Sequence, residues 1–130
     1  MALADLGAHD RPYIQSRIRE EIARGKRHGH PFALLVFEEV PAPDGIAPHK
    51  KMEYGLEALH GIARVEDVVA RAFEDTIVVL LVETDARGAK DALLRMRNRL
   101  ARGAGAWQVT MYEYPQHEAA IEALALLTAA

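Results

Sequence analysis

The feature that most constrains the fold is a pair of apolar runs separated by two carboxylates. Residues 68–70 read Val-Val-Ala, residues 77–82 read Ile-Val-Val-Leu-Leu-Val, and Glu74 and Asp75 lie between them. β-Branched residues dominate both runs, which favours extended strands, and the acidic pair interrupts them where a turn is needed. The stretch therefore predicts a β-hairpin over 68–82 with Glu74 and Asp75 at its tip.

Apolar periodicity predicts the elements before the hairpin. Ile14, Ile18 and Ile22 recur at every fourth position, which is typical of an amphipathic helix, and this helix should end near His28. Residues 32–37 are continuously apolar, so they favour a strand that is buried on both faces in the interior of a sheet.

The remaining segments complete an α+β pattern. Helices are expected over 49–62, 85–102 and 118–127, and a strand over 107–114. After the first helix the order is βαββαβ, which predicts a ferredoxin-like central antiparallel sheet with helices on one side. The chain would then carry an extra N-terminal helix and a short C-terminal helix.

Length and composition favour one folded domain. The chain has 130 residues, of which 50% are hydrophobic, enough for one core. Residues 1–10 are rich in Ala, Gly and Asp and are expected to be a flexible N-terminus, which leaves 11–130 as the domain. No stretch approaches about 18 apolar residues, so no membrane insertion is expected. Residues 1–10 do not resemble a secretory signal, and the expected location is the cytoplasm.

Charge and cysteine content exclude several classes. The formal net charge is −3, which disfavours a partner that is a nucleic-acid polymer. The absence of cysteine excludes disulfide frameworks and thiolate zinc sites. The basic residues gather in two predicted helices, and a solvated helix face is the default interpretation of each. They are Arg17, Arg19, Arg24, Lys26 and Arg27 in the first, and Arg95, Arg97, Arg99 and Arg102 in the second.

The order of these segments over roughly residues 15–115 resembles the GGDEF family of diguanylate cyclases. In that family the hairpin tip reads Gly-Gly-Asp/Glu-Glu-Phe, and the aligned positions here are residues 73–77, Phe-Glu-Asp-Thr-Ile. The resemblance implies a nucleotide-cyclase-like sandwich and a role in bacterial signalling. A homodimer is compatible with it, because the family joins two GTP molecules held on two domains.

The family's catalytic residues are changed at the hairpin tip. The two glycines that let the backbone approach the triphosphate are replaced by Phe73 and Glu74, which add bulk and like charge. Asp75 is retained, and Thr76 stands in place of the carboxylate that follows it. These changes predict that cyclase activity is lost and that the chain is not an enzyme.

The expected metal ligands are also incomplete. Magnesium needs oxygen ligands, and the first-strand carboxylate position aligns with Glu38, whereas the second aligns with Val40. The family's guanine-reading Asn and Asp have no match in residues 41–55. We therefore expect no metal and no cofactor at a vestigial active site made of Glu38, Phe73, Glu74, Asp75 and Thr76.

A second family site is better retained. Many members carry Arg-x-x-Asp upstream of the tip, where it binds cyclic di-GMP as a feedback inhibitor, and this chain has Arg64 and Asp67 in that register with Arg95 at the position of a helping arginine. Arginine suits phosphate or guanine acceptors, and aspartate accepts from guanine N–H groups. The alternative is an ordinary ion pair at the mouth of a strand.

Two functions follow from these motifs. The first is a catalytically inactive GGDEF-like signalling domain that binds cyclic di-GMP at Arg64, Asp67 and Arg95. The second is a ligand-free scaffold, derived from a diguanylate cyclase, that contacts an unidentified partner protein. An enzyme with altered nucleotide chemistry is a remote third.

Overall fold

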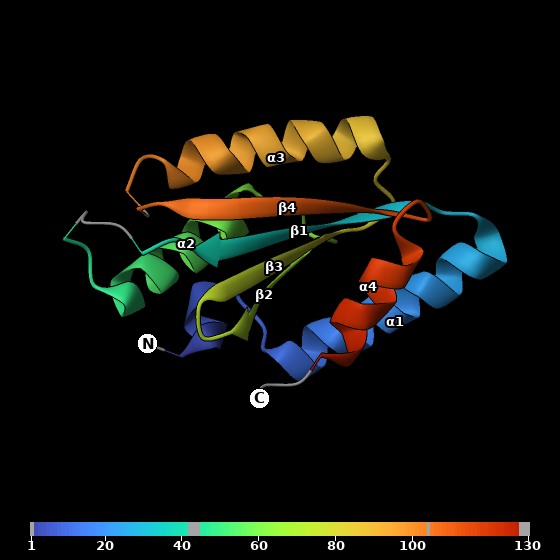
Figure 1. Cartoon of the computed structure of the whole chain (residues 1–130), viewed down its shortest axis with the longest axis horizontal. Coiled ribbons are helices and arrows are strands. Elements are labelled where there is room, and N and C mark those ends of the chain that lie inside the picture. Colours follow the sequence, from blue (N-terminus) through green and yellow to red (C-terminus); the bar gives the residue numbers. More distant parts are fainter. Residues whose placement is uncertain (1, 42–44, 104, 128–130) are drawn as a thin grey trace.

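The computed structural model describes residues 2–41, 45–103 and 105–127, and these build an antiparallel sheet covered by helices (Figure 1). From the first long helix onward the elements run in the order expected, and a short 3-10 helix precedes them. They are η1 (Leu3–Leu6), α1 (Arg11–His28), β1 (Phe32–Glu39), α2 (Pro48–Ile62), β2 (Val68–Phe73), β3 (Thr76–Leu81), α3 (Ala86–Leu100), β4 (Trp107–Tyr114) and α4 (Glu118–Leu126).

The four strands are ordered β2-β3-β1-β4, and every neighbouring pair is antiparallel. β1 lies in the interior, with Leu35 paired to Val79 of β3 on one side and to Met111 of β4 on the other. Residues 32–37 of this strand are all buried, as expected for a central strand whose two faces are covered. The predicted α+β fold with a βαββαβ core is confirmed.

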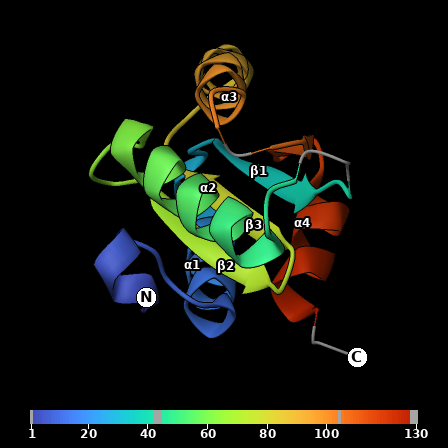
Figure 2. The same cartoon turned by 90° about the vertical axis from the view of Figure 1, so that its left-hand side faces the viewer.

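Helices cover both faces of the sheet. α2 and α3 pack on one face, as the ferredoxin-like pattern predicts, and α1 and α4 occupy the opposite face (Figures 1 and 2). The two predicted additional helices therefore close the second side of the sheet.

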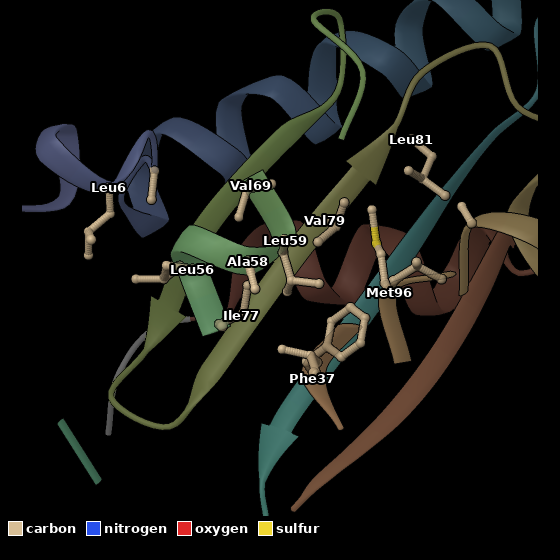
Figure 3. Close-up of a cluster of buried hydrophobic side chains, with 14 of the residues drawn as sticks. Leu6, Phe37, Leu56, Ala58, Leu59, Val69, Ile77, Val79, Leu81 and Met96 are labelled. Atoms are coloured by element: carbon tan, nitrogen blue, oxygen red, sulfur yellow. The ribbon is translucent and has the colours of Figure 1, made fainter. Parts of the chain in front are cut away.

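Alternation along β1 divides the core into two layers. Ala33, Leu35 and Phe37 point toward α2 and α3, whereas Leu34 and Val36 point toward α1 and α4. Figure 3 shows the first layer, in which side chains from the hairpin and the two helices surround Phe37. This layer fixes the hairpin against α2 and α3, which is the side that carries both pockets described below.

The N-terminal segment differs from the flexible stretch expected over 1–10. η1 packs on α2, and Leu6 and Ala8 are buried. His9 then forms a parallel bridge to β2, because its N–H donates to the Val69 carbonyl at 2.9 Å and its carbonyl accepts from the Arg71 N–H at 2.9 Å. The segment thus covers part of the open edge of β2, a contact that local composition does not reveal.

Candidate functional site

The hairpin tip is a tight connection between β2 and β3. The register shifts between Arg71 and Phe73, and Glu74 and Asp75 make the turn. Arg71 Nη2 donates to the Glu74 carbonyl at 2.8 Å, and the Thr76 hydroxyl donates to Asp75 Oδ1 at 2.9 Å. The tip is therefore held by its own side chains.

Phe73 points away from the face on which α2 lies. Its ring packs against the core layer under α1, and the Arg11 guanidinium lies over it at 5.0 Å from the ring centre. At that distance the two groups form a cation–π contact. Phe73 thus contributes to packing on the α1 side of the sheet.

Glu38 and Glu39 both lie beside the tip, Glu38 paired with Thr76 of β3 and Glu39 joined to Asp75. Side chains alternate along a strand, so Glu39 shares the face of Phe37 whereas Glu38 is exposed on the opposite face. The Glu39 N–H donates to the Asp75 carbonyl at 2.9 Å, which joins the end of β1 to the hairpin tip. The predicted vestigial site did not include Glu39, because residues 32–37 are uniformly apolar and do not indicate which face of the strand meets α2.

A pocket of about 240 Å³ lies between these residues and the start of α2. It is lined by Glu39, Pro48, His49, Arg71, Glu74 and Asp75. An adjoining pocket of about 180 Å³ brings in Val40 and the buried Lys51. The retained carboxylates therefore share their environment with two cations.

Burial disfavours the ionised form of one carboxylate in this cluster, Glu39. Burial, followed by the charges of Asp75 and Glu74, raises the pKa of Glu39, whereas Lys51 and Arg71 act in the opposite direction. Glu39 Oε1 and Arg71 Nε are buried without a hydrogen-bond partner among the described residues. Among all the residues that the structure describes, no group of three or more His, Asp or Glu side chains is arranged to hold a metal ion.

A second pocket lies at the other end of the hairpin, between its base and α3. It has a volume of about 200 Å³ and contains all three residues of the predicted ligand site, Arg64, Asp67 and Arg95. Thr84, Gly88 and Asp91 also line it. The structure thus brings together residues from the connection before β2 and from α3, and the two most distant of them are 31 positions apart in the sequence.

Arg64 and Asp67 form a two-pronged ion pair. Arg64 Nη2 lies 3.0 Å from Asp67 Oδ1, and its Nε donates to Oδ2 at 3.2 Å. The Asp67 side chain is only 3% exposed, whereas that of Arg64 is 47% exposed. The hydrogen bond to Asp67 raises the pKa of Arg64, so the guanidinium stays charged.

The same pair closes the base of the hairpin. Arg64 Nη2 also donates to the Val82 carbonyl and to the Thr84 hydroxyl, both at 2.8 Å. Asp67 Oδ1 accepts from the Val82 N–H at 3.3 Å. Both oxygens of Asp67 are therefore already engaged, and the ordinary ion pair considered as the alternative is present.

Arg95 and Asp91 are the less engaged members of this pocket. They lie four residues apart on α3, hence on one face of the helix, and both are exposed. Neither side chain makes an ion pair or hydrogen bond with the rest of the described structure. Asp91 was missed by the sequence analysis, although its i, i−4 spacing from Arg95 would have suggested it.

The helices set one further limit. Among the residues that the structure describes, none of the helices has the length and apolar character needed to span a bilayer.

Comparison with known proteins identifies the fold. No family model and no curated protein matches the sequence. The structure is similar to a DGC protein from Thermotoga maritima, with a TM-score of 0.77 and 17% identity over 90% of this chain and 92% of that chain. It is also similar to the diguanylate cyclase SiaD from Pseudomonas aeruginosa, solved with its activator SiaC, with a TM-score of 0.67 and 22% identity.

That second likeness covers 92% of this chain but 54% of SiaD. A third structure, of a microbial GGDEF domain described with cyclic di-GMP, matches with a TM-score of 0.56 and 19% identity over 90% of this chain and 85% of that chain. These likenesses confirm the GGDEF-like, nucleotide-cyclase-like fold predicted from the sequence.

Proposed function

We propose that this GGDEF-like domain is a catalytically inactive signalling domain that binds cyclic di-GMP at the pocket of Arg64, Asp67 and Arg95. The observation that carries the proposal is their convergence on one cavity from separate elements of the chain. A microbial GGDEF domain of the same fold has been described with this ligand, which supports the choice of nucleotide.

The size of the pocket limits what it encloses. Its volume of about 200 Å³ is below the roughly 300–1,000 Å³ of pockets that bury most of a drug-sized ligand. It would accept one guanine base or one phosphate, and the rest of a cyclic dinucleotide would lie along the surface. An intercalated pair of ligand molecules, as in the resembled family, would then project outward.

The two arginines have different roles in this proposal. Arg64 is held by Asp67, Val82 and Thr84, so it forms a fixed wall of the pocket. Arg95 is exposed and can turn its guanidinium toward a phosphate or toward the O6 and N7 atoms of guanine. Asp91, opposite in charge and one turn away, can accept from the N–H groups of guanine.

The residues of the hairpin tip support the proposal that the domain has no cyclase activity. Glu74 occupies a position where the family needs glycine, and the retained Asp75 sits near Arg71 in a pocket that also holds Glu39. Cations that neutralise the carboxylates compete with the divalent metal that phosphoryl chemistry requires. Loss of activity is therefore part of the proposal.

The second candidate is a scaffold without a ligand. It is favoured by one observation, namely that both oxygens of Asp67 are satisfied within the protein. On this reading the Arg-x-x-Asp segment is kept because it closes the hairpin, and the function is contact with a partner protein or a second copy.

Calorimetry with cyclic di-GMP separates the two candidates. A charge-assisted hydrogen bond contributes about 1.5–3 kcal/mol, so Arg95→Ala should weaken binding by roughly 10- to 150-fold. Arg102→Ala is the matched control, since Arg102 is exposed just beyond the same helix and does not line the pocket. Arg64→Lys keeps the positive charge but loses the planar guanidinium that donates two hydrogen bonds at once, and it should weaken binding as well.

The absence of heat at high micromolar ligand would leave the scaffold as the function. Equal affinity in wild type and Arg95→Ala would place any binding elsewhere. Circular dichroism of each variant establishes that a loss of binding is not a loss of folding.

A further inference from the structure

α3 and the turn after it present an unusual concentration of positive charge. Six cationic side chains lie exposed there, and none of them makes an ion pair or a side-chain hydrogen bond with the other described residues. They are Arg87, Lys90, Arg95, Arg97, Arg99 and Arg102. α3 runs along the outer edge of the molecule, and no other described element lies on its outer side (Figures 1 and 2).

The basic residues of α1 behave differently. Arg17 pairs with Glu20 and Glu21, at 2.8 and 3.3 Å. Arg24 likewise lies 3.1 Å from Glu21, within the same helix. A merely solvated basic helix gains stability from such i, i+3 and i, i+4 partners. On α3 Asp91 has this spacing from Arg87 and Arg95, yet it forms no ion pair with either among the described residues.

Positive charge also gathers on α1, where residues 11–28 carry six cations and two carboxylates, but it is least balanced on α3 and the turn after it. Residues 86–102 carry the six cations and one carboxylate, Asp91. The rest of the chain carries ten cations and eighteen carboxylates, so it is strongly acidic while the whole chain has a formal net charge of −3. Charge is therefore distributed unevenly between α3 with its following turn and the rest of the molecule.

An apolar side chain lies within the cationic surface. Leu94 is 58% exposed, with Lys90 four residues before it and Arg97 three residues after it on the same side of the helix. An exposed leucine flanked by cations combines a site for apolar contact with charges that surround it. Interfaces between proteins combine an apolar centre with a polar rim, and arginine is enriched in them.

We propose that this basic face of α3 (Arg87, Lys90, Leu94, Arg97, Arg99 and Arg102, together with Arg95) docks an acidic, amphipathic helical segment of a partner protein. The partner helix would place an apolar side chain on Leu94 and carboxylates on the flanking cations. α3 has 15 residues, which at 1.5 Å per residue gives a docking surface about 22 Å long. The inference does not depend on cyclic di-GMP binding.

Charge and apolar exposure together favour a protein over other polyanions. A nucleic acid or an anionic membrane extends well beyond α3, and the acidic remainder of the chain would repel it over a distance of about 8–10 Å, the Debye length at physiological salt. A short acidic helix is matched to the cationic surface alone. It also uses Leu94, for which a phosphate backbone has no partner.

The test uses a synthetic acidic helical peptide of about 15 residues, with leucines on one face and glutamates beside them. Fluorescence anisotropy measures its affinity for the full chain. The double variant Lys90→Glu/Arg97→Glu should weaken binding by at least about tenfold, because like charges then face each other. Arg27→Glu/Lys50→Glu is the control, since it makes the same change in net charge at exposed positions on α1 and α2 and should change the affinity by less than about twofold.

Two further arms complete the test. A peptide with its leucines replaced by serine, and the variant Leu94→Ser, should each bind more weakly than the parent pair. Single-stranded RNA and phosphatidylserine vesicles should bind more weakly than the acidic peptide at physiological salt. The proposal is overturned if the peptide does not bind, if both double variants lose affinity equally, if the serine peptide binds as well, or if RNA or vesicles bind more tightly.

Discussion

The backbone N–H of Glu39 donates to the carbonyl oxygen of Asp75 at 2.9 Å, so the last residue of β1 is tied to the tip of the hairpin. This contact brings the acidic tip next to Glu39 and leaves both near Arg71 and Lys51. The hairpin tip therefore lies in a cluster of charges of opposite sign.

The first prediction concerns turnover. Incubation with GTP and either magnesium or manganese should produce no cyclic di-GMP above the background without protein, because the tip has neither the glycines nor the ligand set that phosphoryl transfer needs. Chromatographic detection of the product measures this. Product formation that Asp75→Ala abolishes would show that the hairpin tip is an active site after all.

The second concerns the dependence of stability on pH. Burial raises the pKa of Glu39, so the folded state holds this proton to higher pH than the unfolded state does. Ionisation of Glu39 therefore costs stability as pH rises from its ordinary pKa through the raised one, and costs nothing below the ordinary value.

Glu39→Gln removes that cost. Urea unfolding should find the variant more stable than wild type at about pH 7, with the difference disappearing at about pH 4 or below. Glu38→Gln, one residue earlier and exposed on the other face, is the matched control and should leave the free energy of unfolding at about pH 7 within about 0.5 kcal/mol of wild type. A variant that is less stable than wild type at neutral pH would contradict the assigned sign.

The third concerns the base of the hairpin. Arg64→Ala leaves the buried Asp67 carboxylate without its two-pronged partner, and it should lower the free energy of unfolding by about 1–3 kcal/mol. Glu66→Gln removes only an exposed 3.4 Å ion pair to the same arginine, and it should change stability by less than about 1 kcal/mol. Equal effects in the two variants would contradict the structural role of the Arg64–Asp67 pair.

The fourth concerns the N-terminal segment. Leu6 is 4% exposed, so Leu6→Ala should cost about 2 kcal/mol or more by removing buried apolar contacts. Leu126→Ala makes the same chemical change at a side chain that is 72% exposed on α4, and its effect should stay within about 0.5 kcal/mol. Thermal unfolding of both proteins provides the comparison. A silent Leu6→Ala would mean that η1 adds little to the fold.

The sequence could predict the elements because their signals are local. The spacing of Ile14, Ile18 and Ile22 and the run over 32–37 depend only on neighbouring residues, and the helix and strand appear where expected. The packing of residues 2–10 was not predictable, because it arises from pairing between His9 and a strand some sixty positions away in the chain.

The candidate site was predictable only in part. The resemblance to the GGDEF family grouped Arg64, Asp67 and Arg95 in one predicted site, and the structure places all three in one pocket. The sequence does not reveal that Glu39 shares the face of β1 that meets α2, whereas Glu38 lies on the other face, because the strand is buried on both sides. The engagement of both Asp67 oxygens is likewise a property of the folded hairpin.

The interior position of β1 also fixes when the sheet can form during synthesis. Its partners on one side lie in β3, where Ala33 meets Leu81, and those on the other lie in β4, where Phe32 meets Tyr114. This buried apolar strand is therefore made early and completed late, since its pairing with β4 must wait for residues up to 114 to leave the ribosome. Such non-local pairing slows folding, and it leaves an apolar, aggregation-prone strand exposed until its partner strands have been made. Truncated chains that end before β4 should therefore aggregate, and a growing chain would benefit from a chaperone that shields residues 32–37 until β4 arrives.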